Sequence, residues 1–247
     1  MSDDDDGTGR TESVEGAASL CRSRRPRILL GVTGSVAAVR WEELTLALLS
    51  FADVRVVHTR SALHFSALCG DYAPETSKAW AAAAAEARPG SSGAAASDAT
   101  LVDESARLGL LGDAVEWESY ARVGSDAVIH IELRAWADAF LVAPLSAHTM
   151  AKLAGGFADN LVTTAARAWP FSGGRVAKPF IIAPAMNSDM WAHPVTLSQL
   201  TTLRDWGVRV VNPVVKRLAC GDIGAGALPP ISDIVLAVKQ EMGLGCK

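Results

Sequence analysis

The sequence predicts an α/β protein with a parallel sheet and helices on both of its faces, and three observations support this prediction. Short apolar runs occur at Arg27–Val32, Ala139–Ala143 and Phe180–Ala183. Runs of this length without alternating polar residues are typical of strands buried on both faces of a parallel sheet. A Gly/Ser turn or an Ala-Pro pair ends each run, and a loop that leads into a helical pattern follows. This alternation of strand and helix is typical of βα units.

The composition is that of a globular protein with a substantial core. The chain has 247 residues, of which 49% are hydrophobic, and its formal net charge is −4. A negative net charge without a basic stripe gives no attraction to nucleic acid, so we expect no nucleic-acid partner. The cysteines form neither a CxxC pair nor a zinc-ligand pattern, so we expect no disulfide and no metal site; they are Cys21, Cys69, Cys220 and Cys246.

The start of the sequence is acidic, with a run of aspartates directly after Ser2. A signal peptide needs a basic segment followed by an apolar core, and no apolar run approaches the roughly 20 residues of a membrane span. We therefore expect a cytoplasmic protein in a reducing compartment, without a membrane partner.

We expect one folded domain over residues 26–247, preceded by a disordered tail. Residues 1–25 are polar and lack periodic apolar positions, which is typical of disorder. An Ala-rich stretch at about residues 73–112 predicts an insertion made of a frayed helix and a flexible tether, with little to bury and no chemistry. Later patterns predict helices over residues 159–169, 194–206 and 231–242 and a strand over residues 208–211.

The first predicted βα unit carries a candidate phosphate site. The strand Arg27–Val32 runs into Thr33-Gly34-Ser35, and a helix pattern follows to about Ser50. Backbone amides at the start of such a helix can hold a phosphate. The GxGxxG fingerprint and the P-loop lysine are both absent, so a mononucleotide phosphate fits better than a dinucleotide, and a turn that binds nothing stays an alternative. Thr59 and Ser61, after the next predicted strand, can cap a helix or bind a ligand.

Two loops repeat the same order of strand, Ala-Pro pair and polar segment. One is Ala143–Thr149 and the other is Pro184–Trp191, which contains Asn187. Carboxyl ends of parallel strands meet at one edge of a sheet, where ligands bind, so the two loops together predict a flat, polar-edged pocket suited to a planar ring. The alternative is a capped strand end in which the Met and Trp side chains pack in a core.

Two further residues are candidates for chemistry. His130 lies at the start of a predicted helix and can act as a general base, although a lone histidine is more often structural. Cys220 lies in the Gly-rich segment Lys216–Gly226, a setting in which a thiol is partly exposed and reactive. We expect His58 and His64 to be packing or surface residues.

Four motifs in this order resemble a known family. They are His130-Ile-Glu-Leu-Arg134, Ala143-Pro-Leu-Ser146, Pro184-Ala-Met-Asn187 with Met190-Trp191, and Leu218-Ala-Cys-Gly-Asp222. Together they resemble the phosphopantothenoylcysteine decarboxylases, which belong to the homo-oligomeric flavin-containing cysteine decarboxylases. The resemblance covers the chain from about Arg27 to Asp233, apart from the Ala-rich stretch.

The resemblance implies a three-layer flavodoxin-like (Rossmann-like) fold, a homotrimer, and FMN bound near the interface between subunits. It implies that His130 and Cys220 are catalytic, and that Asn187, Met190 and Ala219 bind the substrate. The positions that it assigns to FMN are Gly34, Ser35, Val36, Thr59, Arg60, Ser61, Ser146, Ala147, His148, Thr149 and Ala185.

The implied reaction converts 4'-phosphopantothenoylcysteine to 4'-phosphopantetheine in coenzyme A biosynthesis. Loss of carbon dioxide from the cysteinyl carboxylate leaves a carbanion without an electron sink, so oxidation to a thioaldehyde comes first and decarboxylation then gives an ene-thiol. Reduction of the ene-thiol completes the cycle. The implied roles are assistance of the oxidative half by His130, orientation of the carboxylate by Asn187, and proton donation by Cys220.

Two features depart from the family pattern, and both bear on affinity and rate more than on reaction type. His148 stands where an Asn is usual, and Pro229-Pro230 end the segment after Cys220. Other functions also stay open: a non-catalytic regulator of the protein phosphatase inhibitor type, or a subunit of a hetero-oligomeric decarboxylase. The joint presence of His130, Asn187 and Cys220 favours an enzyme.

Two related enzyme classes are less well matched. A peptidyl-cysteine decarboxylase stops at the ene-thiol and has no need of Cys220 as a proton donor. A flavin prenyltransferase lacks the decarboxylase pattern Pro184–Asn187.

Overall fold

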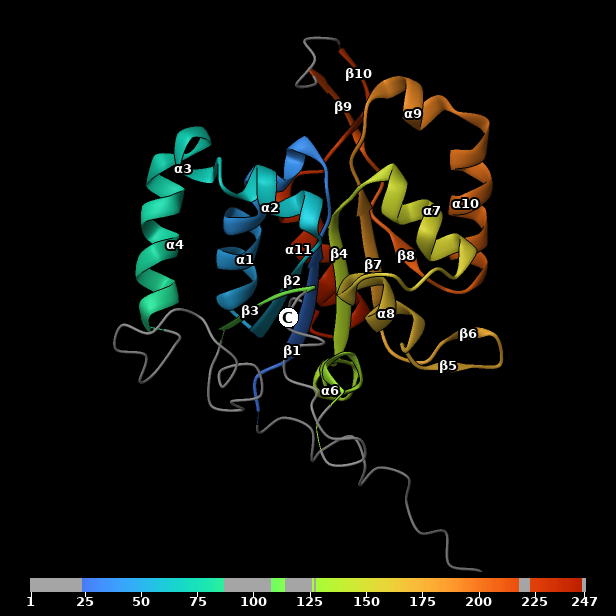
Figure 1. Cartoon of the computed structure of the whole chain (residues 1–247), viewed down its shortest axis with the longest axis horizontal. Helices are drawn as coiled ribbons and strands as arrows, with labels where there is room; N and C mark the ends of the chain where they lie inside the picture. Colours follow the sequence, from blue (N-terminus) through green and yellow to red (C-terminus); the bar gives the residue numbers. More distant parts are fainter. Residues whose placement is uncertain (1–23, 87–107, 114–125, 127, 218–222, 246–247) are drawn as a thin grey trace, which may run out of the picture.

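The structure is a computed structural model that describes residues 24–86, 108–113, 126, 128–217 and 223–245. Its centre is a six-stranded sheet in the order β3-β2-β1-β4-β7-β8, with every neighbouring pair parallel (Figure 1). The strands are β1 (Arg27–Val32), β2 (Asp53–His58), β3 (Leu108–Gly112), β4 (Ala139–Leu145), β7 (Phe180–Pro184) and β8 (Arg209–Val210). This order is that of a doubly wound Rossmann-like sheet, and it confirms the predicted fold class.

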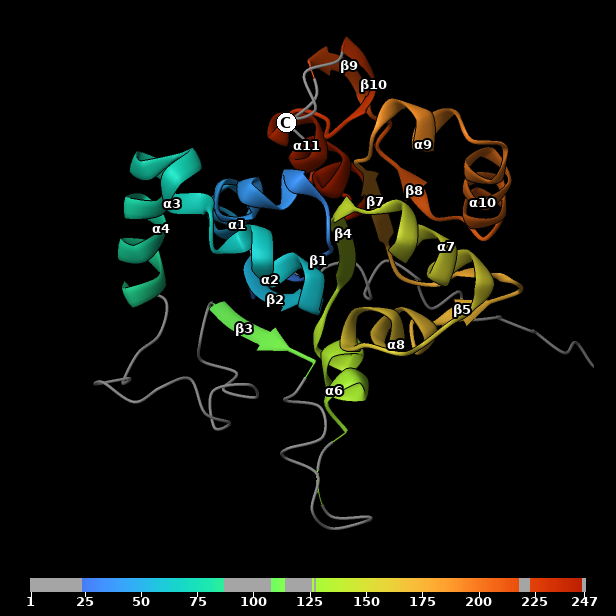
Figure 2. The same ribbon diagram turned by 45° about the horizontal axis from the view of Figure 1, so that its top comes forward.

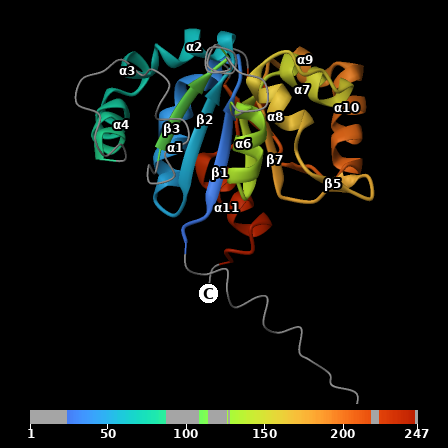
Figure 3. The ribbon, with the colours of Figure 1, turned by 60° about the horizontal axis from the view of Figure 1, so that its bottom comes forward.

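Helices cover both faces of the sheet, so the molecule has three layers (Figure 3). One face packs against α1 (Trp41–Leu49) and α11 (Ile231–Glu241), whereas α4 (Pro74–Glu86) packs against α1 (Figure 1). The other packs against α6 (Ile129–Trp136), α7 (Ala147–Gly155), α8 (Leu161–Arg167) and α10 (Pro194–Asp205). Successive residues of β1 face opposite layers: Ile28 and Leu30 belong to one core and Leu29 to the other. This double burial is why the strands have apolar runs without alternation.

Short elements gather where the strands end. The loops after β1, β2 and β7 lead into η3 (Val36–Arg40), α2 (Arg60–Ser66) followed by α3 (Cys69–Tyr72), and α9 (Ser188–Ala192). A hairpin of β9 (Val214–Arg217) and β10 (Ile223–Ala227) stands at the same end of the sheet (Figures 1 and 2). A second hairpin, β5 (Phe171–Ser172) with β6 (Arg175–Val176), lies beyond α8. The predicted helices over residues 159–169, 194–206 and 231–242 correspond to α8, α10 and α11.

The Ala-rich stretch contains more structure than its composition predicts. Trp80 of α4 is only 8% exposed and packs edge-on against Trp41 of α1, with ring centroids 4.7 Å apart. Leu108 and Leu111 are buried in β3, which extends the sheet beyond β2. The expectation that this stretch has little to bury was wrong, because one large aromatic and a short apolar strand suffice to attach it to the core. Residues 87–107 lie outside the described residues.

The described residues begin at Arg24, and residues 1–23 of the predicted tail lie outside them. Arg24 donates two hydrogen bonds to the Asp138 carboxylate, at 2.8 and 2.7 Å, and Arg25 donates one to Asp53 at 3.1 Å. These contacts hold the chain at the amino end of β1. Among the described residues, no helix combines the length and the apolar character needed to cross a membrane.

Candidate functional site

A cavity of about 670 Å³ opens at the carboxyl ends of β1, β4 and β7. Its volume is in the range of small-molecule and cofactor sites. The wall combines hydroxyl, amide and thioether groups with apolar side chains; it is formed by Gly34, Ser35, Val36, Ala37, Val39, Arg40, Phe65, Tyr72, Ser146, Ala147, His148, Ala185, Met186, Asn187, Met190, Lys216, Gly226, Ala227 and Leu228.

Hydrogen bonds tie the loops that follow β1, β4 and β7 into one edge. The Thr33 hydroxyl donates to the carbonyl of Pro144 at 2.8 Å and accepts from the amide of Ser146 at 2.7 Å. The Ser35 hydroxyl donates to the carbonyl of Ala185 at 3.0 Å, while Ser35 also caps η3. The Gly-Ser turn and the two Ala-Pro loops, which the sequence predicts at one edge, therefore do lie together.

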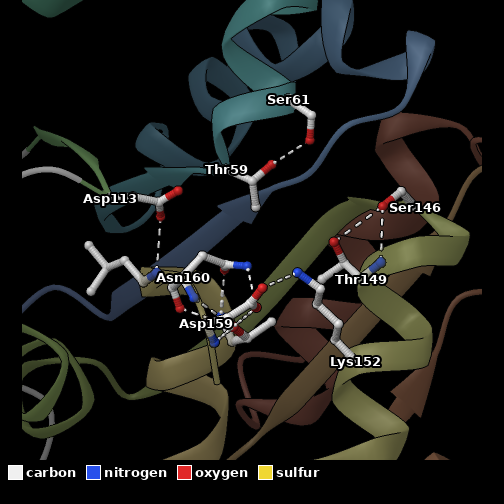
Figure 4. Close-up of polar contacts among 10 residues, drawn as sticks. Thr59, Ser61, Asp113, Ser146, Thr149, Lys152, Asp159 and Asn160 are labelled. Carbon is white, nitrogen blue, oxygen red and sulfur yellow. Dashed lines mark hydrogen bonds and ion pairs between the residues drawn. The ribbon is translucent and has the colours of Figure 1, made fainter. Parts of the chain in front are cut away.

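The loop after β2 packs against the Gly-Ser turn that follows β1. A Cβ atom on Gly34 would lie 2.3 Å from the Ser61 hydroxyl, so only glycine fits beside that side chain. The Ser61 and Thr59 hydroxyls lie 3.3 Å apart, and Thr59 caps α2 by accepting from the amide of Ala62 (Figure 4). Thr59, Arg60 and Ser61 do not line the cavity; Ser61 borders it through Gly34.

The N-terminus of α7 forms another part of the wall. Ser146 caps this helix by accepting from the amide of Thr149 at 3.2 Å, and its hydroxyl donates to the Thr149 hydroxyl at 3.2 Å (Figure 4). Ala147 and His148, in the first turn, line the cavity. Thr149 is 3% exposed and lies behind Ser146, so it positions the cap and does not line the wall.

A neighbouring polar cluster is structural. Asn160 caps α8 in a reciprocal capping box with Thr163, and Lys152 of α7 pairs with Asp159 just before that helix (Figure 4). The Lys152 partner lowers the pKa of the Asp159 carboxyl below its usual value. These contacts join α7 to α8 and fix the start of α8 at Asn160.

The loop after β7 brings Asn187 and Met190, two of the predicted substrate contacts, to the cavity wall. Asn187 caps α9 by accepting from the amide of Asp189 at 2.7 Å, which fixes its carboxamide. The amide of Met186 donates to the carbonyl of Gly226 at 2.9 Å, so the root of the β9–β10 hairpin is attached to this loop.

His130 is not part of this cavity. It lies in the first turn of α6, where Ile129 and Leu133 are buried against the sheet, and it does not line the wall. Leu133 is 4% exposed and Ile131 is 42% exposed, so the apolar residues around His130 are divided between the core and the surface. The other predicted catalytic residue, Cys220, and the predicted substrate contact Ala219 lie outside the described residues.

His58 and His64 are a packing residue and a surface residue, as we expected. His58 is 5% exposed, and its ring meets that of Trp41 edge-on at 4.7 Å. Burial lowers the pKa of His58 from 6.5 to about 4, so this imidazole is neutral near pH 7. His64 lies on the exposed side of α2.

Ten residues of the wall are not among the predicted site residues: Ala37, Val39, Arg40, Phe65, Tyr72, Met186, Lys216, Gly226, Ala227 and Leu228. Arg40 lies one helical turn after the Gly-Ser turn, and this spacing is the sequence signal that could have identified it as a wall residue. Phe65 and Tyr72 come from α2 and α3, and only the folding of these helices over the edge brings them there.

The wall fits a flavin mononucleotide in size and chemistry. A planar ring system needs apolar surfaces, which Val36, Met186 and Leu228 provide, together with polar edges. The backbone amides at the two helix starts, which Ser35 and Ser146 cap, offer donors to an anion and to ring heteroatoms.

Known proteins match most of this chain. The family model described as Flavoprotein matches residues 17–243. Phosphopantothenoylcysteine decarboxylase HAL3a of Glycine max is 39% identical over 234 residues, which cover 94% of this chain and 89% of that protein. Phosphopantothenoylcysteine decarboxylase of Mus musculus is 38% identical over 225 residues, covering 90% of each.

Solved structures of similar proteins superpose on most of this chain. A cysteine-to-serine mutant of PPC decarboxylase complexed with pantothenoylaminoethenethiol superposes with a TM-score of 0.69 at 38% identity, covering 88% of this chain and 98% of that one. The FMN binding protein AtHal3 superposes with a TM-score of 0.67 at 37% identity, covering 91% and 100%. The chain therefore belongs to the flavoprotein family, within the branch of the phosphopantothenoylcysteine decarboxylases.

Proposed function

We propose that this protein binds FMN and decarboxylates 4'-phosphopantothenoylcysteine to 4'-phosphopantetheine, a step of coenzyme A biosynthesis. The observation that carries the proposal is the cavity at the carboxyl ends of β1, β4 and β7, in which Ser35, Ser146 and Asn187 converge. Relatives that cover nearly the whole chain are named for this activity, which supports it.

In this proposal, Ser35 and Ser146 hold the cofactor at the two capped helix starts, with Gly34 and Ser61 shaping the turn. FMN, when bound, supplies the reversible two-electron acceptor that decarboxylation of an amide-linked cysteine requires. The side chains of the protein then have three tasks: they bind the substrate, orient its carboxylate, and move protons.

Asn187 orients the carboxylate. Its carboxamide is held by the α9 cap and lies on the cavity wall, so it can donate to a carboxylate oxygen without reorganisation. Cys220 donates the proton that completes reduction of the ene-thiol; it belongs to the segment between β9 and β10, and β9 contributes Lys216 to the same wall.

His130 reaches the reaction from a second copy of the chain, and the protein is a homotrimer. Two observations support this part of the proposal. His130 does not line the cavity of its own chain. It is flanked by Val128 and Ile131, which are 38% and 42% exposed and offer apolar surface for contact with another subunit.

The test is mass spectrometry of the purified, FMN-containing protein after incubation with 4'-phosphopantothenoylcysteine. We expect loss of carbon dioxide and formation of 4'-phosphopantetheine. The variant Cys220→Ser should accumulate the ene-thiol, which is two hydrogens poorer than the product. Absence of any product from FMN-loaded protein would overturn the proposal and favour the regulatory function.

A further inference from the structure

The carboxyl end of α6 is held by an ammonium group from another part of the chain. Lys178, two residues before β7, donates from its Nζ atom to the carbonyls of Arg134 and Ala137, at 3.1 and 2.8 Å. In a longer helix the Arg134 carbonyl would accept from the amide of Asp138, but that amide donates to the carbonyl of Arg27 at 2.8 Å. Lys178 therefore satisfies carbonyls that the end of the helix leaves without an intrahelical partner. Its positive charge also complements the negative end of the helix dipole.

Lys178 is itself fixed by Trp169, which follows α8. The Lys178 ammonium lies 5.7 Å from the centroid of the Trp169 ring, and the Trp169 Nε1 atom donates to the backbone carbonyl of Lys178 at 3.1 Å. Trp169 is 2% exposed and packs against Phe140 of β4 and Phe180 of β7. The ammonium that holds the end of α6 is thus anchored to the core of the sheet.

A second contact fixes the rotation of α6 about its own axis. Trp136, in the last turn of the helix, lies against Arg55 of β2, whose Cζ atom is 4.5 Å from the indole centroid. Arg55 is 1% exposed, and a cation removed from water is attracted more strongly to an indole than an exposed one. Gly109 of β3 leaves the space for this side chain, because a Cβ atom there would lie 2.4 Å from the Cδ atom of Arg55.

The amino end of α6, which carries His130, is held in a different way. Val128, the residue before the helix, makes no side-chain capping hydrogen bond, and Ile129 and Leu133 attach the helix to the sheet by apolar contact. Apolar contacts are non-directional, so they keep the helix on the sheet without fixing its position along its axis. The polar contacts at the carboxyl end fix that position. His130 lies only about 9 Å along the axis from Trp136, at roughly 1.5 Å per residue.

We propose that Lys178 is a positioning residue for His130. By fixing the carboxyl end of α6, it sets where the imidazole near the other end meets the substrate. This inference rests on the proposed function, in which His130 assists the oxidative half of the reaction. In that half the CH2–SH group of the substrate becomes CH=S: its thiol gives up a proton, which His130 accepts, and its C–H bond gives up a hydride to FMN. A shift of α6 would lengthen the path of the proton and slow this half.

The experiment compares Lys178→Met, which removes the ammonium and keeps an apolar stem, with Lys178→Arg, which restores a cationic donor. Lys239→Met is the matched control. Lys239 of α11 is half-buried like Lys178, and its ammonium also lies over an aromatic ring, 4.7 Å from the Phe51 centroid, on the face of the sheet opposite α6. Four quantities are measured on the FMN-containing protein: hydrogen exchange of the α6 amides, the rate at which 4'-phosphopantothenoylcysteine bleaches the flavin without oxygen, FMN affinity, and oligomeric mass.

We expect Lys178→Met to raise the exchange rate of the α6 amides about tenfold and to slow flavin bleaching about tenfold at saturating substrate. The substrate concentration for half-maximal bleaching, the FMN affinity and the oligomeric mass should stay as in wild type, whereas a general loss of structure would change all three. Lys178→Arg should recover most of both losses, and Lys239→Met should match wild type.

Bleaching in Lys178→Met as fast as in wild type, or unchanged exchange of α6, would overturn the positioning role. Equal slowing in Lys239→Met would do the same. If Lys178→Met does not fold, Lys178→Gln takes its place with the same expectations, because it keeps an amide donor and loses only the charge. Hydrogen exchange does not require turnover: faster exchange in the variant, together with a wild type whose flavin the substrate does not bleach, would refute the proposed function and leave the attachment of α6 by Lys178 standing.

Discussion

Gly34 leaves the space that the Ser61 side chain occupies, and this contact helps to join the turn after β1 to the loop after β2. The hydroxyl and the Cβ of Ser61 would lie 2.3 and 2.6 Å from a Cβ atom at position 34, so neither partner can give way by a small rotation. The conformational freedom of glycine is not what is required here; the requirement is space.

Gly34→Ala should therefore displace Ser61 and distort the cofactor wall. We expect FMN affinity to fall by about tenfold or more, measured by quenching of flavin fluorescence, with a small change in thermal stability. The double variant Gly34→Ala/Ser61→Gly removes the clash and should recover much of the affinity. Equal affinity of Gly34→Ala and wild type would contradict the assignment of this turn to the cofactor.

His58 links stability to pH. It is 5% exposed, its Nε2 atom is buried without a partner among the described residues, and burial lowers its pKa from 6.5 to about 4. Below pH 6.5 the His58 imidazole is protonated in the unfolded chain but stays neutral in the folded chain down to about pH 4. The stability that the folded chain has through neutral His58 is therefore present above pH 6.5 and is lost as the pH falls toward 4.

We expect the free energy of unfolding to decrease by about 2 kcal/mol between pH 7 and pH 5 through this one group. Urea unfolding of wild type and of His58→Phe at both pH values measures it, because phenylalanine keeps a ring against Trp41 and cannot titrate. The variant should lack this part of the pH dependence. Equal slopes in both proteins would refute the assignment.

At the scale of elements, α4 is attached to the domain mainly through Trp80. Its remaining face is alanine-rich and largely exposed, so helix propensity alone does not hold it in place. Trp80 buries its ring against Trp41, and α4 contributes no residue to the cavity wall.

Trp80→Ala should destabilise the protein by about 3 kcal/mol and release α4 from α1, while FMN affinity stays close to that of wild type. Urea unfolding and hydrogen exchange of α4 amides report the two effects. Ala81→Ser, at an exposed position of the same helix, is the control and should change stability by less than about 0.5 kcal/mol. An unchanged stability in Trp80→Ala would show that α4 has another anchor.

The β9–β10 hairpin depends on Gly226 in a similar way. This residue has φ = +119°, and a Cβ atom would lie 2.4 Å from the carbonyl oxygen of Met186, so both conformation and space require glycine. The hairpin carries Lys216 and flanks the segment that contains Cys220.

Gly226→Ala should shift the hairpin and raise KM for 4'-phosphopantothenoylcysteine by about tenfold or more, with a smaller effect on FMN affinity. Steady-state kinetics and flavin fluorescence separate the two quantities. Gly112→Ala is the matched control, because a Cβ atom there meets nothing within 4 Å. Weaker FMN binding with an unchanged KM would place the hairpin at the cofactor instead.

At the scale of the whole molecule, a single chain is an incomplete active site under the proposed function. Asn187 lines the cavity, whereas His130 lies on α6 outside it. A symmetric oligomer can bring the two together only if His130 of one copy meets the cavity of the next.

Mixing two inactive variants tests this arrangement. His130→Asn and Asn187→Asp should each be inactive alone, and trimers assembled from an equal mixture should regain about a quarter of wild-type activity, since random pairing restores one interface in four. Two preparations of His130→Asn mixed together are the control. No recovery, from mixed oligomers shown by native mass spectrometry, would mean that both residues act within one chain.

Local chemistry was predictable from the sequence. The apolar strands, the Gly-Ser turn and the cap at Thr59 depend on neighbours a few residues away, so their patterns are visible in the linear chain. The convergence of the turn and the Ala-Pro loops also followed, because parallel strands end at one edge of a sheet.

Tertiary structure decided which distant side chains share a space. It brought Arg40 and Lys216 to one wall, placed Thr149 behind Ser146, and left His130 outside the cavity. It also showed that α4 and β3 belong to the core, where composition predicted an insertion. Sequence patterns report the preferences of neighbouring residues, whereas these outcomes depend on contacts between segments far apart in the chain, which only packing in three dimensions determines.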